Sequence, residues 1–306
     1  MINLEFTGTM SIKIEIDQDS GFCAGVQRAI RLAEKELKKS KKLYCLGEIV
    51  HNHPELNRLK ALGLKIINYD EFKKLHNVKV LIRAHGEPPE IFTIASENQI
   101  EIINATCPIV SKLQAKIRTD YQESRLKGGN IIIYGKLDHP EVRALLGQTE
   151  GNAKVIKELS DLDENWLNEP VYLYSQTTMN QKDYEELISG ISEKVHNASH
   201  DPGEIVAVND TICRHVSHRQ SGIEEFARYH EIILFVSSKE SSNGRVLFEH
   251  CKSINPSSFF ITDTDDIKQI DLGKTSSIGI CGATSTPGWL LEKVRLKVNE
   301  SLALNQ

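Results

Sequence analysis

The chain has 306 residues, of which 40% are hydrophobic and 26% are charged, and its formal net charge is −5. These values are typical of a globular protein with a sizeable core, and the length suggests two or three domains. The charge excludes a general attraction to nucleic acid, and the longest apolar runs, such as 131–134 and 232–236, are far too short to cross a bilayer.

The amino-terminal residues lack the basic start and apolar stretch of a signal peptide, so we expect a cytoplasmic protein. In a reducing compartment, six cysteines indicate metal ligands, nucleophiles or packed thiols rather than a disulfide scaffold. Cys45, Cys251 and Cys281 lie in or beside apolar runs, and we expect them to be plain buried thiols.

The first repeat of the chain begins with a β-type run at 14–17, followed by Cys23 and an amphipathic helix. Strands are then predicted at 43–46, 65–67 and 79–82. The first of these leads into a polar loop that contains His51, and the last leads into a polar turn that contains His85.

The second repeat has the same order. A β-type run at 101–103 precedes Cys107, and Val110, Leu113 and Ile117 form the apolar stripe of the helix that follows. Strands are predicted at 131–134, 154–156 and 171–174; the loop after the first carries His139 and Glu141, and the turn after the last carries Thr177.

The third repeat starts with a β-type run at 205–208, then Cys213 and a weaker helical pattern. Its later strands are predicted at 232–236, 259–261 and 277–280. Here the polar residues after the strands are uncharged donors: Ser241, Ser242 and Asn243 in the first loop, and Ser285 in the last turn.

Strands that alternate with helices predict parallel α/β units, in which ligand-binding residues gather beyond the carboxyl ends of the strands. We therefore predict three small α/β domains around a central cleft, at 1–105, 106–204 and 205–306. The three repeated cysteines are 84 and 106 residues apart, too far for a local zinc knuckle. If the repeats close around one centre, the thiols converge on an iron–sulfur cluster or a three-thiolate metal site.

Nine motifs between residue 12 and about residue 295 resemble, in their order along the chain, those of the IspH (LytB) family of diphosphate reductases. The resemblance implies three pseudo-threefold-related α/β domains around a central [4Fe–4S] cluster. It also implies reduction of 4-hydroxy-3-methylbut-2-enyl diphosphate to isopentenyl and dimethylallyl diphosphates, the last step of the non-mevalonate isoprenoid route. Electrons would come from a ferredoxin- or flavodoxin-type donor. The motifs are GFCAGVQRAI, GEIVHN, RAHG, NATCP, HPEV, QTTMN, DTICRHVSHRQ, SSKESSNGR and TSTP.

The resemblance also assigns roles to residues. It implies that the three repeated cysteines bind the cluster, that Glu141 relays a proton to the leaving hydroxyl, and that Thr177 contacts this hydroxyl. Without the resemblance, Glu141 would be read as a carboxylate that offsets a helix dipole, and the Ser-Ser-Asn-Gly run as a helix N-cap. The implied substrate-binding residues are His51, His85, His139, Thr177, Ser241, Ser242, Asn243 and Ser285, and the implied metal ligands are Cys23, Cys107 and Cys213.

Two positions leave a choice of register. His53-Pro54-Glu55 imitates the His139-Pro140-Glu141 motif, but His51 lies four residues after Gly47 as His139 lies four after Gly135. We therefore select His51 and expect His53 to start a helix. Alignment on Ser-Thr-Pro selects Ser285, whereas alignment on Gly-Ala would select Thr284.

Two other functions compete with this interpretation. A metal-dependent diphosphate hydrolase with zinc bound by Cys, His or Glu would be colourless and redox-inactive. A non-enzymatic iron–sulfur carrier or sensor would not need so many donor loops around a diphosphate-sized cleft.

Overall fold

In the computed structural model, residues 12–198, 206–273 and 275–304 are described, and the chain divides into two compact units. The continuous unit runs from Cys23 to Ser217. The split unit combines the segment that ends at Phe22 with the segment that begins at His218. The described strands form three four-stranded sheets, two in the continuous unit and one in the split unit.

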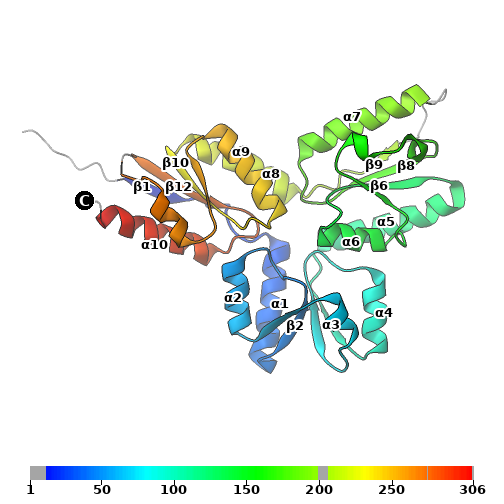
Figure 1. The fold of residues 1–306 in the computed structure, drawn as a ribbon, viewed down its shortest axis with the longest axis horizontal. Helices are drawn as coiled ribbons and strands as arrows, with labels where there is room; N and C mark the ends of the chain where they lie inside the picture. The colour runs from blue at the N-terminus through cyan, green and yellow to red at the C-terminus, as the bar shows by residue number, and fades with distance from the viewer. Residues whose placement is uncertain (1–11, 199–205, 274, 305–306) are drawn as a thin grey trace, which may run out of the picture. The chain divides into compact units, whose positions relative to one another are not determined.

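The first sheet of the continuous unit has the strand order β3-β2-β4-β5, and all its strand pairs are parallel. Its helices lie on both faces, as Figure 1 shows. Of the apolar stripe predicted after Cys23, Ile30, Ala33 and Leu37 of α1 are buried, and Val26 is half-buried. The elements are α1 (Ala24–Ser40), β2 (Leu43–Leu46), α2 (His53–Ala61), β3 (Leu64–Ile67), α3 (Tyr69–Lys73), β4 (Lys79–Ile82), α4 (Pro89–Glu97) and β5 (Glu101–Asn104).

The second sheet of the continuous unit has the order β7-β6-β8-β9, again with parallel pairs. In Figure 1, α7 covers one face of this sheet, and α5 and α6 cover the other. The predicted stripe Val110, Leu113 and Ile117 of α5 is buried. The elements are α5 (Pro108–Lys127), β6 (Asn130–Tyr134), α6 (Pro140–Gly147), β7 (Lys154–Ile156), β8 (Val171–Ser175), α7 (Gln181–Ala198) and β9 (Val206–Val208), with 3₁₀ turns at Leu159–Asp161 and Glu164–Leu167.

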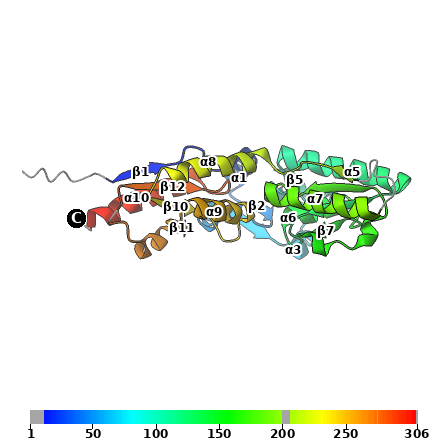
Figure 2. The same ribbon diagram turned by 90° about the horizontal axis from the view of Figure 1, so that it is seen from above.

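The sheet of the split unit has the order β1-β12-β10-β11. Figure 2 shows β1 beside β12, and the two strands pair in parallel from Lys13↔Ser277 to Ile16↔Ile280. Helix α8 begins in the continuous unit and extends into this one. The elements are β1 (Lys13–Ile16), α8 (Arg214–Arg228), β10 (Ile232–Val236), α9 (Ser242–Ile254), β11 (Ser258–Ile261), the 3₁₀ turn Thr264–Gln269, β12 (Ser277–Gly282) and α10 (Gly288–Leu304).

The three sheets repeat one strand order, because β11-β10-β12-β1 matches β3-β2-β4-β5 and β7-β6-β8-β9. The fold class, three small parallel α/β sheets with the same topology, is confirmed. The strand before each cysteine is the edge strand of a sheet: β5 pairs with β4 and β9 with β8, whereas β1 pairs with β12, far later in the chain. The strands β1 and β9 thus lie outside the sheets of the predicted domains 1–105 and 205–306, and that division stays a prediction. Position 205 of the predicted third run lies outside the described residues.

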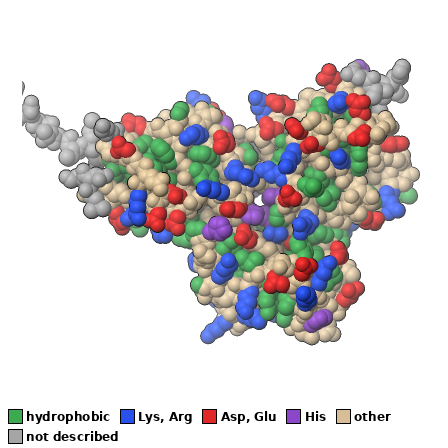
Figure 3. All heavy atoms as spheres, in the orientation of Figure 1, with side chains coloured by type: hydrophobic (Ala, Val, Ile, Leu, Met, Phe, Trp, Pro, Cys, Tyr) green, Lys and Arg blue, Asp and Glu red, His purple; other side chains and the backbone are tan. Residues whose placement is uncertain are grey.

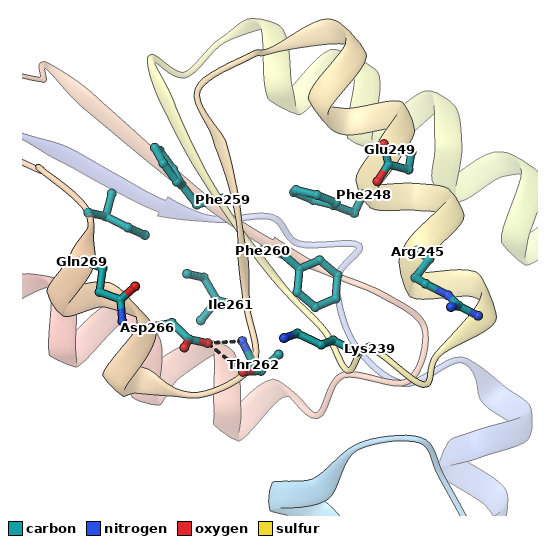
Figure 4. Close-up of a pocket in the computed structure, with 11 residues that line it drawn as sticks. Lys239, Arg245, Phe248, Glu249, Phe259, Phe260, Ile261, Thr262, Asp266 and Gln269 are labelled. Carbon is teal, nitrogen blue, oxygen red and sulfur yellow. Dashed lines mark hydrogen bonds between the residues drawn. The ribbon is translucent and has the colours of Figure 1, made fainter.

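Cys45, Cys251 and Cys281 are fully buried, as predicted. Of the helices in the described ranges, none is both long enough and apolar enough to cross a membrane. The split unit has a groove of about 640 Å³ beside β11 and α9, walled by Phe248, Phe259 and Phe260 (Figure 4). None of the predicted site residues lines this groove.

Candidate functional site

Three free cysteines, Cys23, Cys107 and Cys213, form the thiol triad of the continuous unit. Cys23 and Cys107 are the N-cap residues of α1 and α5, and Cys213 directly precedes α8. A Cβ atom built on Gly25 would lie 2.9 Å from Sγ of Cys107 and 3.9 Å from Sγ of Cys23. The two sulfur atoms therefore flank a glycine that has no room for a side chain.

Backbone hydrogen bonds fix the position of two members of the triad. The N–H of Cys107 donates to the carbonyl of Ala84 beyond β4 at 2.9 Å, and the N–H of Cys213 donates to the carbonyl of Thr177 beyond β8 at 2.9 Å. Each cysteine is thus tied to the carboxyl end of a strand in the preceding sheet, where parallel α/β proteins place their ligand-binding residues.

Burial raises the pKa of Cys23 and of Cys213. Backbone N–H groups at the helix starts favour the thiolate form of both residues, whereas the neighbouring cysteines oppose it. Three thiolates close together repel one another unless a cation binds between them. Thiolate sulfur is a soft ligand that suits iron in clusters, so this donor set fits an iron–sulfur group with three protein ligands.

His51, His85 and His139 form the histidine group of the continuous unit. Their ring centroids are 5.2 to 6.2 Å apart, and one nitrogen of each ring lies within 4.8 Å of the others. Figure 3 shows several histidine side chains at the surface of the molecule. Nε2 of His51 and Nδ1 of His85 are buried and have no hydrogen-bond partner among the described residues. These nitrogens are available to a polar ligand.

Burial, followed by the field of Arg83 and the other rings, lowers the pKa of His85 well below its ordinary value. Burial, and then His51 and Arg83, lowers the pKa of His139 to about 3. These two rings are therefore neutral at physiological pH and can offer one N–H donor each.

The tautomer of His139 follows from its place as the N-cap of α6. Its Nδ1 accepts the backbone N–H of Glu141 at 3.2 Å, so the proton of the neutral ring sits on Nε2. A metal ion needs a lone pair on the coordinating nitrogen, and this ring presents an N–H instead. Three histidines at this spacing can hold a metal ion. The bond from Glu141 to Nδ1 of His139, however, leaves an N–H on Nε2, and this donor favours a hydrogen-bond acceptor such as an anion.

Glu141 is 1% exposed and contacts the turn after β8. Its Oε1 accepts the backbone N–H of Thr177 at 2.7 Å, and its Oε2 accepts the hydroxyl of Thr177 at 2.8 Å. Burial raises the pKa of Glu141, and the two bonds from Thr177 partly offset this effect. The carboxyl group thus retains its proton closer to neutral pH than a solvated glutamate does, and Thr177 connects it through the backbone to Cys213.

Ser241, Asn243, Thr284 and Ser285 form the serine–asparagine group of the split unit. Ser241 caps α9 by accepting the N–H of Gly244 at 3.0 Å, and its hydroxyl lies 3.0 Å from that of Ser285. Nδ2 of Asn243 donates to the hydroxyl of Thr284 at 2.6 Å, and Oδ1 of Asn243 has no partner among the described residues. Ser241, Ser242 and Asn243 are buried. The start of a helix with several uncharged donors is suited to an anion.

The structure separates His51 from His53, but it does not separate Ser285 from Thr284. His51 lies in the histidine group, whereas His53 is exposed at the first position of α2, after the N-cap Asn52. Glu55 of the imitating motif is bonded to Arg58. Thr284 and Ser285 both reach the serine–asparagine group, through Asn243 and Ser241 respectively.

The model of the family described as LytB protein matches residues 14–299. The chain belongs to the LytB family. A 4-hydroxy-3-methylbut-2-enyl diphosphate reductase of Bacteroides fragilis is 50% identical over 283 residues, 92% of this chain and 96% of that protein. A reductase of the same name from Porphyromonas gingivalis is 50% identical over 285 residues, 92% of this chain and 97% of that protein.

Two solved structures of reductases resemble this LytB-family chain. One is described as (E)-4-hydroxy-3-methyl-but-2-enyl diphosphate reductase, the terminal enzyme of the non-mevalonate pathway; it has a TM-score of 0.69 and 31% identity, over 95% of this chain and 100% of the other. The other, an E-1-hydroxy-2-methyl-but-2-enyl-4-diphosphate reductase from Plasmodium falciparum, has a TM-score of 0.80 and 24% identity, over 94% of this chain and 88% of the other, and supports the fold.

Sequence reasoning missed Gln176 of the family's QTTMN motif. Gln176 is fully buried; its Oε1 accepts the N–H of Lys136 at 3.1 Å, and its Nε2 donates to the hydroxyl of Thr178 at 2.8 Å. It therefore ties the loop before His139 to the turn that carries Thr177. A glutamine beside two motif threonines was the available signal, but only the packed structure reveals its burial and its partners.

Proposed function

We propose that this chain reduces 4-hydroxy-3-methylbut-2-enyl diphosphate to isopentenyl and dimethylallyl diphosphates, as the last step of the non-mevalonate isoprenoid route. The observation that carries the proposal is the arrangement of the continuous unit, where Cys213 of the thiol triad is bonded through its backbone to Thr177, the partner of the buried carboxyl group of Glu141. The reaction takes up two electrons and two protons, breaks the C–O bond to the hydroxyl group and releases water.

Cys23, Cys107 and Cys213 are proposed to hold a [4Fe–4S] cluster. The fit rests on the three thiols at helix starts and on the space around Gly25 that a Cβ atom would fill. When bound by three thiolates, such a cluster supplies electrons singly and retains one iron without a protein ligand.

The diphosphate end of the substrate is proposed to contact His51, His85 and His139 of the histidine group, and Ser241, Ser242, Asn243 and Ser285 of the split unit. The support is chemical: these residues carry ring nitrogens, hydroxyls and an amide, and Nε2 of His51 and Nδ1 of His85 are buried without a partner among the described residues. A hydrogen bond from a neutral group to a charged phosphate oxygen is stronger than one between two neutral groups.

Glu141 is proposed to provide the proton for the departing hydroxyl group, since hydroxide is a poor leaving group. Its raised pKa keeps it protonated nearer to neutral pH. The hydroxyl of Thr177, 2.8 Å from Oε2 of Glu141, is proposed to contact the substrate hydroxyl as well. Thr177 would then connect the acid to the leaving group.

The electrons are proposed to come from a ferredoxin- or flavodoxin-type carrier in the cytoplasm. The reaction needs two electrons delivered singly, and carriers of this type transfer one electron at a time. Neither nucleic acid nor membrane is proposed as a partner, in keeping with the net charge of −5.

Anaerobic assay of the iron-loaded protein, with dithionite and a viologen mediator, tests the function. We expect both isoprenoid diphosphates by chromatography, together with iron, sulfide and a brown colour with broad absorption. A colourless zinc protein that hydrolyses the diphosphate without reductant would support the hydrolase instead. An iron–sulfur protein without turnover would indicate a carrier or sensor.

A further inference from the structure

Arg83, directly after β4, packs its side chain against the loop that carries His51. The side chain of Arg83 is 8% exposed. A Cβ atom on Gly47 would lie 2.6 Å from Cζ and from Nη1 of Arg83, so the guanidinium rests against the bare backbone of this residue. Nη1 also donates to the carbonyl of Glu48 at 3.5 Å. Gly47, whose φ is +72°, therefore serves two purposes, since it allows both the turn and the close approach.

Glu87, whose carboxylate is bonded to Tyr69, lies beside Arg83. Its Nε lies 3.6 Å from Oε1 of Glu87, which is 1% exposed, and neither atom has a hydrogen-bond partner among the described residues. The hydroxyl of Tyr69 donates to Oε2 of Glu87, and the guanidinium of Arg143 lies 4.8 Å from the centre of the Tyr69 ring. The side chain of Arg83 is thus fixed between the Gly47 loop and Glu87.

Positive charge beside His85 comes from Arg83, and beside His139 from Arg83 and Lys136, rather than from these two rings themselves. Both rings are neutral at physiological pH, and Arg83 contributes to the lowering of both pKa values. A guanidinium, by contrast, keeps its charge at every pH at which proteins are stable. Burial strengthens its field, because the local dielectric constant is low.

We propose that Arg83 is a substrate-positioning residue: it sets the Gly47–His51 loop and supplies a fixed positive charge behind the histidines, opposed by Glu87. The inference rests on the proposed diphosphate site and adds a residue that touches the loop rather than the substrate. If the charge acts, removal of Arg83 and removal of the Glu87 charge must change anion affinity in opposite directions. A purely structural ion pair predicts that both changes weaken binding.

The test measures binding of inorganic diphosphate to the full-length, anaerobically prepared, iron-loaded protein by calorimetry at pH 8. Arg83→Met should weaken binding roughly 10- to 100-fold, as expected for charges several ångströms apart at an effective dielectric constant near 20. Arg83→Lys, which keeps the charge without the planar fork, should recover part of this loss. Glu87→Gln, which keeps a partner for Tyr69, should bind severalfold more tightly. Arg125→Met removes an exposed arginine of the same unit and should bind as wild type does.

The outcomes distinguish this inference from the proposed function. Failure of the wild-type protein to bind diphosphate would refute the diphosphate site itself. Wild-type binding with unchanged affinity in Arg83→Met would overturn the role of Arg83 alone. Equal or weaker binding in Glu87→Gln would overturn the charge mechanism. If Arg83→Met does not fold, as a thermal melt would show, the signs of the Arg83→Lys and Glu87→Gln changes decide the matter.

Discussion

The histidine group of the continuous unit and the serine–asparagine group of the split unit lie at equivalent places of one repeated sheet. His139 and Ser241 cap the helices after β6 and β10, which are equivalent strands of their sheets, and Thr177 and Ser285 follow the neighbouring strands β8 and β12. Yet burial shifts the pKa values of His85, His139 and Glu141 in the continuous unit, whereas the side chains of the serine–asparagine group do not titrate. The difference suggests that one fold places acid–base chemistry in the continuous unit and uncharged binding in the split unit.

Replacement of a triad cysteine should have the largest effect, because three ligands leave no spare. We expect Cys23→Ser, Cys107→Ser or Cys213→Ser to lose most of the iron of anaerobically prepared protein, measured by iron and sulfide analysis. Cys45→Ser, Cys251→Ser and Cys281→Ser replace fully buried thiols elsewhere and should keep the iron. Iron loss in Cys45→Ser with retention in Cys23→Ser would reject the ligand assignment.

Glu141→Gln tests whether the buried carboxyl group is an acid. The variant keeps the size of the side chain and an acceptor for Thr177, but it has no titratable proton. We expect kcat to fall roughly 10²- to 10⁴-fold with iron content unchanged. Glu55→Gln is the matched control, since Glu55 is equally buried, at 1% exposure, and follows Pro54 as Glu141 follows Pro140. A near-normal kcat in Glu141→Gln would leave Glu141 as a helix-start carboxylate only.

His51→Ala should weaken binding of inorganic diphosphate roughly 10- to 100-fold, because a hydrogen bond to a charged group is worth about 1.5–3 kcal/mol. His53→Ala removes the exposed histidine two residues later and should change affinity little. Both are measured by calorimetry at equal iron content. A larger loss for His53 would mean that the His-Pro-Glu imitation marks the site.

The lowered pKa of His139 predicts that acid destabilises the continuous unit. An unfolded histidine binds a proton near pH 6.5, whereas folded His139 does so only near pH 3. Stability therefore falls as the pH falls through this window, by about 2 kcal/mol between pH 7 and pH 5. His139→Asn, which keeps a helix-capping acceptor, should remove that loss, and His53→Asn should not. Urea unfolding followed at Trp166, with Trp289 replaced by Phe, measures it; equal pH dependence in wild type and His139→Asn would contradict the assignment.

Local sequence patterns predicted most of the fold. The apolar stripes of α1 and α5 and the buried runs of β2, β6 and β10 are short-range signals. The pairing of β1 with β12 was not predictable, because it joins residues more than 250 positions apart and no local alternation encodes the partner. In the site, motifs indicated the cysteines, histidines and Glu141. Gln176 and Arg83 were missed. The role of each depends on the buried polar groups that it contacts, and these contacts appear only in the folded structure.

Replacements in the serine–asparagine group should have the smallest effects on diphosphate affinity. They also test whether the hydroxyl of Ser285 or that of Thr284 contacts the phosphate. Ser241 accepts the N–H of Gly244, so it can donate to Ser285, whose own proton is then directed to a ligand. Thr284 instead accepts from Asn243 and orients that amide. Ser285→Ala should therefore weaken diphosphate affinity about 3- to 10-fold, the range for one neutral hydrogen bond, and Thr284→Val less than about twofold. Neither change should shift the pH dependence of binding, since no titratable group is lost. A larger effect of Thr284→Val would assign the phosphate contact to Thr284, as alignment on Gly-Ala predicts. A shift in the pH dependence of binding would contradict the distinction between a titratable and a non-titratable group.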